Sequence, residues 1–495
     1  MISLCTLNAK FLHASLGLRW LYANMGELKA STRLLEFDIN QSPRDIVEQL
    51  VASRPRIVAF GVYLWNVDQT LSVVRMLKAL DPSLVVVVGG PEVSHETEGQ
   101  PIAAAADHVI CGEADLAFAE LCAALLRSEQ RPRVLRPALP DLEKLVFPWD
   151  EYSASDLEHR LLYVEASRGC PYRCEFCLSS LDEKVRALPL DPFLAAMQRL
   201  LDRGAKHFKF VDRTFNLDLR TSRRILEFFL ERLGPGLFLH FELVPDRLPA
   251  ALREVIAKFP PGVLQFEVGI QTLNPEVERL ISRRQDQAKL EDNLRWLKSS
   301  SHVHVHADLI VGLPGEDLPS FARGFDRLVR LEPQEIQVGV LKRLKGTPIT
   351  RHEGMVYSPV PPFEVLRTPK LTFEEVSLLR RFARTWDLFA NSGDFKLTFA
   401  RLLAEAPSPF ELVMKLNARV AGPQVGIALT RRFRIMFGFL VEELGWSREA
   451  AAEQLLLDYV RVGKSDRASW LDSLPDAKLA QATLDARQQR HRGPA

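Results

Sequence analysis

Cysteine and unbalanced charge are both scarce in this chain. Its 495 residues include only six cysteines, and 64 basic against 63 acidic residues leave a formal net charge of +1. Such a balance provides no electrostatic footprint for nucleic acid or for a membrane surface. The sequence also lacks the roughly 20 consecutive apolar residues of a membrane span and the basic-then-apolar start of a signal peptide. We therefore expect a cytoplasmic globular protein with neither DNA nor a membrane as partner.

Three of the six cysteines, Cys170, Cys174 and Cys177, form a CxxxCxxC run. Three thiolates on one loop can each hold one corner of a [4Fe–4S] cube. Because a fourth cysteine is missing nearby, the remaining iron would keep an open coordination site, which indicates chemistry rather than electron relay. A zinc knuckle is the alternative, but it expects four Cys or His ligands, usually as two separated pairs. The spacing therefore favours the cluster.

The other three cysteines are Cys5, Cys111 and Cys122, and each sits inside an apolar-periodic segment. A free thiol in such a segment is usually a small core residue. We therefore expect these three to be structural.

Residues 1–127 alternate short strand-like runs with helical ones. Strands are expected at 2–7, 33–37, 57–61, 84–89 and 109–111, and helices at 16–29, 43–53, 68–80 and 114–126. Such alternation predicts a flavodoxin-like, doubly wound parallel sheet with helices on both faces. Ligands bind these sheets at the carboxyl ends of the strands. We therefore expect a binding site on the loops that follow the strands.

Residues 161–350 follow a proline-marked linker at 128–160 and repeat a strand–helix pattern. Strand-like runs occur at 161–166, 207–211, 238–243, 264–270, 302–310 and 336–341. This repetition predicts a barrel or partial barrel. After a second group of prolines, apolar residues at three- and four-residue spacing predict helices over 373–460. The segment 351–495 is thus expected to be a helical domain, with a polar tail from 476.

The pleat of the barrel strands predicts which side chains face the lumen, since alternate side chains point to opposite sides. The apolar set should face the covering helices, which leaves a polar set inside. The polar set includes His240, Glu242, Gln265 and Glu267, and on the fifth run His302, His304, His306 and Asp308. A closed eight-strand barrel fills its centre with apolar side chains. The polar set therefore predicts an open centre that holds a ligand.

The histidine row on the fifth run allows three interpretations. Imidazoles on one face can bind zinc or iron, but residues i and i+2 on a strand lie roughly 6–7 Å apart, so at most two neighbours could bind one ion without distortion. His304, His306 or Asp308 could instead face a substrate. Ordinary hydrogen-bonded polar positions are the third interpretation.

The run Ser167–Cys177, which reads SRGCPYRCEFC, resembles the motif of radical S-adenosylmethionine (SAM) enzymes. In that family SAM chelates the open iron, and its one-electron cleavage gives a 5′-deoxyadenosyl radical. The family usually folds as a partial (β/α)6 barrel and draws its electron from a flavodoxin- or ferredoxin-type donor. The resemblance implies SAM contacts at Phe176, Asp212, Arg213, Glu242, Glu267, Gln271 and Gly312. For Asp212 and for Glu316, which ends the fifth-strand motif, a helix cap is the alternative role.

The strand-end loops of residues 1–127 together resemble the cobalamin-binding domain that precedes the radical SAM domain in one large subfamily. Some members of that subfamily end in a helical domain of unknown function. The DxHxxG motif that often supplies an axial histidine is absent, so the resemblance implies base-off cobalamin over the loop 63–66. The implied cobalamin positions are His13, Tyr63, Leu64, Trp65, Asn66, Gly89, Gly90, Gly112 and Glu113.

The resemblance implies an enzyme, with a methyltransferase as the leading function. Methylcobalamin would methylate an unactivated carbon, or phosphorus, of a small molecule or peptide. Radical rearrangement or cyclisation with the same cofactors is the alternative. A tRNA-modifying methylthiotransferase would need a second cluster, and a sensor would not need an open iron. The acceptor must meet both cofactors, so we expect it between the cobalamin and the row His304, His306 and Asp308, which are the candidate catalytic residues.

Overall fold

The computed structural model describes residues 1–182, 184–420 and 426–464, together with Ala468 and Trp470. The chain divides into two compact units. The first comprises residues 1–269, 278–304 and 342–365, and the second comprises 270–277, 305–341 and the described residues from 366 onward. The predicted polar tail from 476 lies outside the described residues.

The N-terminal sheet has six parallel strands in the order β2-β1-β3-β4-β5-β6. The strands are β1 Ile2–Asn8, β2 Thr32–Asp38, β3 Ile57–Gly61, β4 Val85–Gly89, β5 His108–Ile110 and β6 Val134–Leu135. The order of the first five is that of flavodoxin-like sheets, whose ligands bind where the order reverses, here between β1 and β3. The predicted doubly wound sheet is therefore confirmed.

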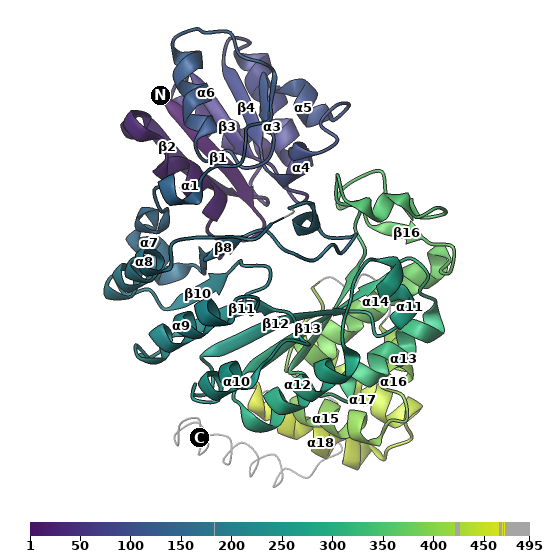
Figure 1. Ribbon diagram of the computed structural model, residues 1–495. Coiled ribbons are helices and arrows are strands. Elements are labelled where there is room, and N and C mark those ends of the chain that lie inside the picture. Colours follow the sequence, from purple (N-terminus) through teal and green to yellow (C-terminus); the bar gives the residue numbers. More distant parts are fainter. Residues whose placement is uncertain (183, 421–425, 465–467, 469, 471–495) are drawn as a thin grey trace. The chain divides into compact units, whose positions relative to one another are not determined.

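Helices cover both faces of this sheet (Figure 1). One face packs against α2 Pro43–Ala52, α3 Val67–Leu80 and α5 Pro101–Ala105, and the other against α1 Leu16–Ala23 and α6 Ala117–Leu126. Cys5 and Cys111 belong to the first of these cores and Cys122 to the second, and all three are buried. Their predicted structural role agrees with these positions.

The helix predicted over 16–29 is interrupted. Helix α1 ends at Ala23, and a separate 3-10 helix, η1 Gly26–Ser31, follows. Gly26 has a φ of +55°, a left-handed conformation that glycine adopts without steric cost and that cannot continue an α-helix.

The segment 128–160 is packed against its surroundings. Strand β6 extends the sheet beside β5, and Trp149 and Tyr152 are among the largest fully buried side chains. The Tyr152 hydroxyl donates a 2.7 Å hydrogen bond to the carbonyl of Tyr163. A capping box at Ser153 starts α7 Ala154–His159. The segment joins the sheet to the barrel as an ordered element, and the domain boundaries proposed from the sequence stay a prediction.

The first four barrel strands pair in parallel in chain order. They are β7 Leu162–Val164, β10 His207–Phe210, β11 Phe238–Leu243 and β12 Leu264–Gln271, alternating with α8 Leu190–Asp202, α9 Leu219–Leu230, α10 Ala250–Ile256 and, after β12, α12 Gln287–Ser300. Burial alternates along all of β12, with the apolar residues buried, as the pleat predicts. On the apolar side Phe210 and Phe241 stack with ring centroids 4.4 Å apart.

The second unit holds the last two strands and the C-terminal helices. Strands β13 His304–Val311 and β14 Glu335–Val340 are parallel neighbours, with α13 Leu318–Val329 between them in the chain. The helices that follow are α14 Phe373–Trp386, α15 Lys396–Glu405, α16 Pro409–Arg419, α17 Leu429–Gly438 and α18 Arg448–Arg461. Phe325 of α13 packs edge-on against Phe382 and Trp386 of α14. The six strands and their helices form the predicted partial (β/α)6 barrel, followed by the predicted helical domain.

His302 does not belong to the histidine row as predicted. Strand β13 begins at His304, and His302 precedes it in an exposed position. The apolar residues of β13 are buried in alternation from Val305 onward, which agrees with the prediction for the rest of the strand.

Five shorter elements lie near the candidate site or in the loops around it. They are α4 Pro91–Ser94, β8 Ser167–Arg168, β9 Arg186–Ala187, α11 Pro275–Leu280 and η5 Pro348–Arg351. Within the described segments, no helix has both the length and the apolar composition needed to cross a bilayer.

Candidate functional site

The cysteine loop, residues 167–177, leaves the barrel just after β7 and starts in a short antiparallel pair, β8 with β9. Gly169 has a φ of +92°, and a Cβ there would lie 2.4 Å from the carbonyl oxygen of Lys184. Only glycine fits this turn, which directs the chain into Cys170. All three cysteines of the loop carry free thiols.

Two arginines lie near the sulfur atoms of the cysteine loop. Burial raises the pKa of the Cys170 and Cys174 thiols, while the positive charge of Arg213 acts in the opposite sense on Cys170. Arg283 Nη1 donates to Cys174 Sγ at 3.5 Å. Because metal-bound cysteines are thiolates, these guanidinium groups favour the ligand form of the sulfurs.

Glu175 anchors the middle of the cysteine loop. Its carboxylate is 2% exposed and accepts hydrogen bonds from Ser282 Oγ at 2.6 Å, from His352 Nε2 at 2.8 Å and from the Arg351 guanidinium. The backbone N–H of Ile349 donates to the Glu175 carbonyl at 3.0 Å. The loop is therefore fixed to two segments distant in sequence, and the sequence analysis assigned Glu175 no role.

Asp212 fixes the start of the same loop. Its carboxylate accepts from the Ala166 N–H at 3.0 Å and from Ser167 Oγ at 2.6 Å. Burial raises the pKa of Asp212 to about 7. The side chain does not cap a helix, since the N-cap of α9 is Asp218. A contact between Asp212 and SAM stays a prediction.

Glu242 and Glu267 stand opposite each other on paired strands β11 and β12. Burial raises the pKa of Glu242, whose nearest cation is Arg213 at 3.5 Å. Burial also opposes ionisation of Glu267, but His240 at 2.9 Å and Lys209 at 3.2 Å outweigh it and lower its pKa to about 2. The two carboxyl groups therefore differ in charge preference although they are neighbours.

In the second unit, Glu316 follows the turn at Gly312, whose φ is +88°. Its carboxyl is 3% exposed and accepts from Thr272 Oγ1 at 2.7 Å, and burial raises its pKa to about 7. The N-cap of α13 is Asp317, so Glu316 is not the cap. Gln271 ends β12 with a φ of +68°. The predicted SAM contacts of Gly312 and Gln271, like that of the half-buried Phe176, stay predictions.

A cavity of about 340 Å³, here called the strand-end cavity, lies at the carboxyl ends of β3, β4 and β5, beside α1 and α6. Its lining is mainly apolar and includes Leu16, Trp20 and Phe118. Gly90 has a φ of +105°, and a Cβ there would lie 2.6 Å from the Val62 carbonyl oxygen, so glycine is required. Five of the predicted cobalamin positions line the cavity, namely Tyr63, Gly89, Gly90, Gly112 and Glu113.

The other four predicted cobalamin positions are not among the lining residues. His13 Nδ1 lies 2.7 Å from the Tyr163 hydroxyl, and burial lowers the pKa of His13. Trp65 is half exposed and stacks on Tyr63 at 4.5 Å. Asn66 is fully buried and accepts from the Tyr63 N–H at 2.8 Å, so it shapes its own loop. Leu64, between Tyr63 and Trp65 in the chain, is half-buried.

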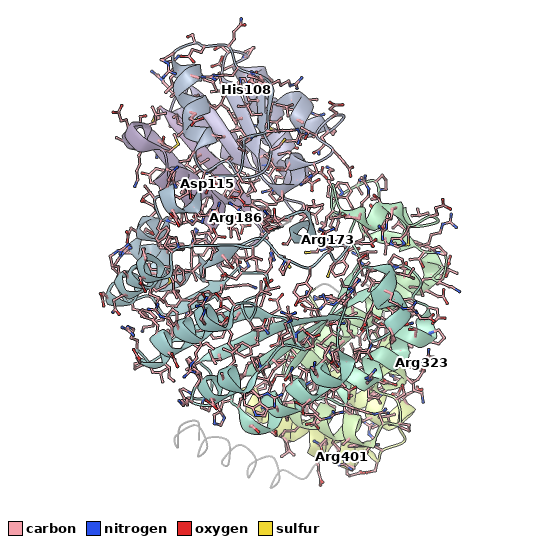
Figure 2. The ribbon with its side chains drawn as sticks, in the orientation of Figure 1. His108, Asp115, Arg173, Arg186, Arg323 and Arg401 are labelled. Atoms are coloured by element: carbon pink, nitrogen blue, oxygen red, sulfur yellow. The ribbon has the colours of Figure 1, made fainter. Side chains whose placement is uncertain are left out.

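Arg168 joins the cysteine loop to the strand-end cavity, whose wall it forms in part. Its guanidinium donates to Glu113 at 2.7 Å, to Asp115 at 2.9 Å and to Glu165 at 2.9 Å, and it lies 4.5 Å from the centre of the Trp20 ring. Arg186 also binds Glu113, and Figure 2 labels it together with Asp115. The sequence analysis gave Arg168 no role, although it stands two residues before Cys170.

The histidine row of the second unit is organised around His306. Its Nε2 lies 3.3 Å from Asp308 Oδ1 and its Nδ1 lies 3.5 Å from Glu335 Oε2. These partly buried groups form a polar cluster on β13 and β14.

Three family models match successive parts of the chain. The B12 binding domain matches residues 2–122, the Radical SAM superfamily matches residues 164–326, and a protein family of unknown function, DUF4080, matches residues 352–492. The cysteine loop and the strand-end cavity thus lie in the segments that these first two models describe.

Two structures of known enzymes share this fold. TsrM from Kitasatospora setae, a radical SAM methyltransferase with cobalamin and a [4Fe–4S] cluster bound, covers 85% of the chain and 99% of its own with a TM-score of 0.59 at 15% identity. The cobalamin-dependent SAM radical enzyme OxsB covers 99% of the chain and 80% of its own, with a TM-score of 0.59 at 13% identity. The chain thus combines a B12 binding domain with a Radical SAM domain. Its cofactors are a [4Fe–4S] cluster, SAM and cobalamin.

Curated relatives match only part of the chain. An uncharacterized methyltransferase of Pyrococcus horikoshii is 24% identical over 299 residues, which cover 55% of this chain and 63% of the relative. The ribosomal protein uS12 methylthiotransferase RimO of Carboxydothermus hydrogenoformans is 26% identical over 203 residues, which cover 39% and 46%. The chain therefore spans less than two thirds of the length of these relatives.

The residues of the two sites fit these cofactors. Across the described ranges, no group of three or more His, Cys, Asp or Glu side chains is arranged to hold a metal ion. A single zinc ion would draw its thiolates to within about 2.3 Å of one point, whereas a cube binds each thiolate at a different corner. The three free thiols on one loop suit the larger group. The apolar strand-end cavity suits a planar organic ring.

Proposed function

We propose that this enzyme transfers a methyl group from cobalamin to an unactivated carbon, or phosphorus, of a small molecule or peptide. The observation that carries the proposal is the shared side chain of Arg168, which belongs to the cysteine loop and to the wall of the strand-end cavity. When bound, SAM and the cluster supply a carbon radical and cobalamin supplies the methyl group. Methyl transfer of this kind needs the radical and the methyl group at the same acceptor atom. The cysteine loop and the strand-end cavity must therefore be held next to each other.

The chain's own residues supply position and charge for this chemistry. Asp212 and Glu175 hold the cysteine loop at its start and its middle. The mainly apolar part of the strand-end cavity lining, which includes Leu16, Trp20 and Phe118, would shield one face of the cofactor from water. His13 is already engaged by Tyr163, which supports cobalamin bound without a histidine ligand. We propose the cluster of His304, His306 and Asp308 as the acceptor-binding group.

A methylthiotransferase is the second candidate, because RimO is among the relatives. That reaction would need ligands for a second cluster. Cys5 and Cys122 lie in the cores on opposite faces of one sheet, and Cys111 shares the core of Cys5. Since the three thiols are buried on two sides of a sheet, they cannot converge on one cluster. The positions of the cysteines thus favour a methyltransferase.

Anaerobic incubation of the cofactor-loaded enzyme with SAM, a reductant and a cell extract tests the proposal. Mass spectrometry should detect an extract component that gains one methylene unit and that carries label from methyl-labelled SAM. A product of unchanged mass would show rearrangement instead, and a product that gains sulfur would show methylthiolation. All six cysteines are free and the cluster is expected to be oxygen-sensitive, so we propose a reducing cytoplasmic location.

A further inference from the structure

A second cavity, of about 660 Å³, lies beside the cysteine loop and is separate from the strand-end cavity. We call it the arginine cavity. It is lined by Pro171, Tyr172 and Arg173 of the cysteine loop, by Asp246 and Arg247 after β11, and by Arg279, Ser282, Arg283 and Arg284 near the end of α11. None of the chemistry assigned above uses its exposed arginines.

The arginine cavity carries a large excess of positive charge. Five arginines and a single aspartate line it. The carboxylate of that aspartate, Asp246, already accepts the backbone N–H of Asp286 at 2.9 Å. Arg173, Arg247 and Arg284 are exposed, and within the described segments no carboxylate forms an ion pair with any of them. Their charge is therefore available to a partner that comes from solution.

This charge lies directly against the ligands of the cluster. Arg173 is the residue before Cys174, and Tyr172, over whose ring the Arg247 guanidinium lies at 5.8 Å, is two residues after Cys170. Arg283 Nη1 reaches Cys174 Sγ at 3.5 Å from the wall of the cavity. A group seated on the cavity would thus be separated from the cluster by little more than the cysteine loop.

We propose that the arginine cavity is the docking site of an acidic one-electron carrier protein that reduces the cluster. The proposal rests on the proposed function, which needs one electron for each SAM cleavage. A small-anion site would hold its charges in a buried, hydrogen-bonded arrangement, whereas Arg173, Arg247 and Arg284 are exposed and free to meet a broad surface. Carboxylates on such a surface would pair with them, and the opposite fields would steer association.

The electron transfer balances without another reactant. The carrier's anionic flavin hydroquinone loses one electron and becomes the neutral semiquinone, and the oxidised cluster held by Cys170, Cys174 and Cys177 gains that electron. No bond is formed or broken at this step, and no proton is transferred.

Charge reversal at Arg173, Arg247 and Arg284 tests the proposal with a bacterial flavodoxin as the probe. The triple variant Arg173→Glu, Arg247→Glu, Arg284→Glu should weaken flavodoxin binding by at least about tenfold, and each single variant should weaken it in part. Reduction of the cluster by flavodoxin hydroquinone, followed by electron paramagnetic resonance, should slow in parallel. Reduction by titanium(III) citrate and the iron content should stay at the wild-type level.

Arg323→Glu is the matched control, since Arg323 is an exposed arginine of α13 outside the cavity (Figure 2). It should leave flavodoxin binding unchanged. Unchanged flavodoxin binding and cluster reduction in the triple variant would overturn the proposal. A triple variant that still binds flavodoxin but no longer binds an RNA oligonucleotide bound by the wild type would overturn it as well. If the wild type reduced by titanium(III) citrate does not cleave SAM, the proposed function fails, while the flavodoxin dissociation constants still decide the docking site.

Discussion

Arg168 Nη2 lies 2.9 Å from Asp115 Oδ1, and this contact ties the first residues of the cysteine loop to the cobalamin-binding domain. Both side chains are nearly buried, at 11% and 6% exposure, and Glu113 and Glu165 complete the arrangement. Three carboxylates thus share one guanidinium, and Glu113 among them also pairs with Arg186.

Arg168→Met should lower the free energy of unfolding by about 3–5 kcal/mol, because it removes the cation and leaves buried carboxylates unpaired. Cobalamin affinity and iron content should fall together, since one side chain serves both sites. Urea unfolding, equilibrium binding of hydroxocobalamin and iron analysis measure the three quantities. Arg199→Met, which removes an exposed pair with Asp150, should cost no more than about 1 kcal/mol. Equal small effects for both variants would contradict the assigned role of Arg168.

Replacement of Cys170, Cys174 or Cys177 by Ala should abolish SAM cleavage and reduce the iron content, because each thiolate is expected to hold one corner of the cube. Cys122→Ala provides a control, since Cys122 is a buried core residue of α6 and does not belong to the loop. That variant should keep its iron. Retention of about four irons and full cleavage in the triple Ala variant would refute the assignment of the ligands.

His13→Ala should leave the electron paramagnetic resonance spectrum of bound cob(II)alamin unchanged. The reason is the 2.7 Å contact of His13 Nδ1 with the Tyr163 hydroxyl, which holds the imidazole away from the strand-end cavity. Nitrogen hyperfine splitting that disappears in the His13 variant would establish axial ligation and contradict the prediction.

Asp212 should make the stability of the enzyme depend on pH. Burial raises its pKa from an ordinary 3.8 to about 7. The folded chain therefore keeps a proton that the unfolded chain releases, so the stabilising contribution of Asp212 falls as pH rises from about 4 to about 7 and is absent above that.

In Asp212→Asn this pH dependence should disappear, which urea unfolding at about pH 5 and about pH 8 would detect as a smaller difference than in the wild type. Asp218→Asn is the control: it keeps an N-cap on α9, and hydrogen bonds at the cap outweigh burial to lower the pKa of Asp218. Its slope between these pH values should match the wild type. The same slope in all three proteins would show that Asp212 ionises normally.

Single Ala replacements of His304, His306 and Asp308 should reduce methylated product while sparing SAM cleavage in the absence of acceptor. His306 lies within 3.3 Å of Asp308 and 3.5 Å of Glu335, so its replacement should have the largest effect. Product and 5′-deoxyadenosine are measured in one assay by mass spectrometry. His302→Ala, at the exposed position before β13, should behave as the wild type. Normal methylation by all three variants would move the acceptor pocket elsewhere.

Periodicity predicted the strands well where burial is regular and failed where a local conformation decides. The alternation along β12 follows directly from its sequence, whereas the left-handed conformation of Gly26 ends the first helical segment in the middle of an apolar pattern. His302 continues the polar alternation of β13 but has no place in the strand. The spacing of apolar residues does not show at which residue the backbone hydrogen bonds of a strand begin.

Site residues were predictable when a motif or a strand end marks them. Tyr63, Gly89 and Gly90 line the strand-end cavity as expected from their positions after β3 and β4. Arg168 and Glu175 were missed because their partners lie at least 50 residues away in the chain, at Glu113 and at Arg351. Such pairs arise only from tertiary packing, and one sequence contains no periodic signal for them.

The short strand β6 limits how this enzyme can be dissected. It lies at 134–135, and the Cys111 N–H donates to the Leu135 carbonyl at 2.9 Å. A fragment cut at residue 127 would expose the edge of β5 as a template for pairing with other chains, so it should self-associate. A fragment that continues past Tyr152 would retain β6 and the edge-to-face contact between the rings of Trp20 and Trp149. Protein engineers who wish to graft the cobalamin module onto another catalyst should move their cut site accordingly.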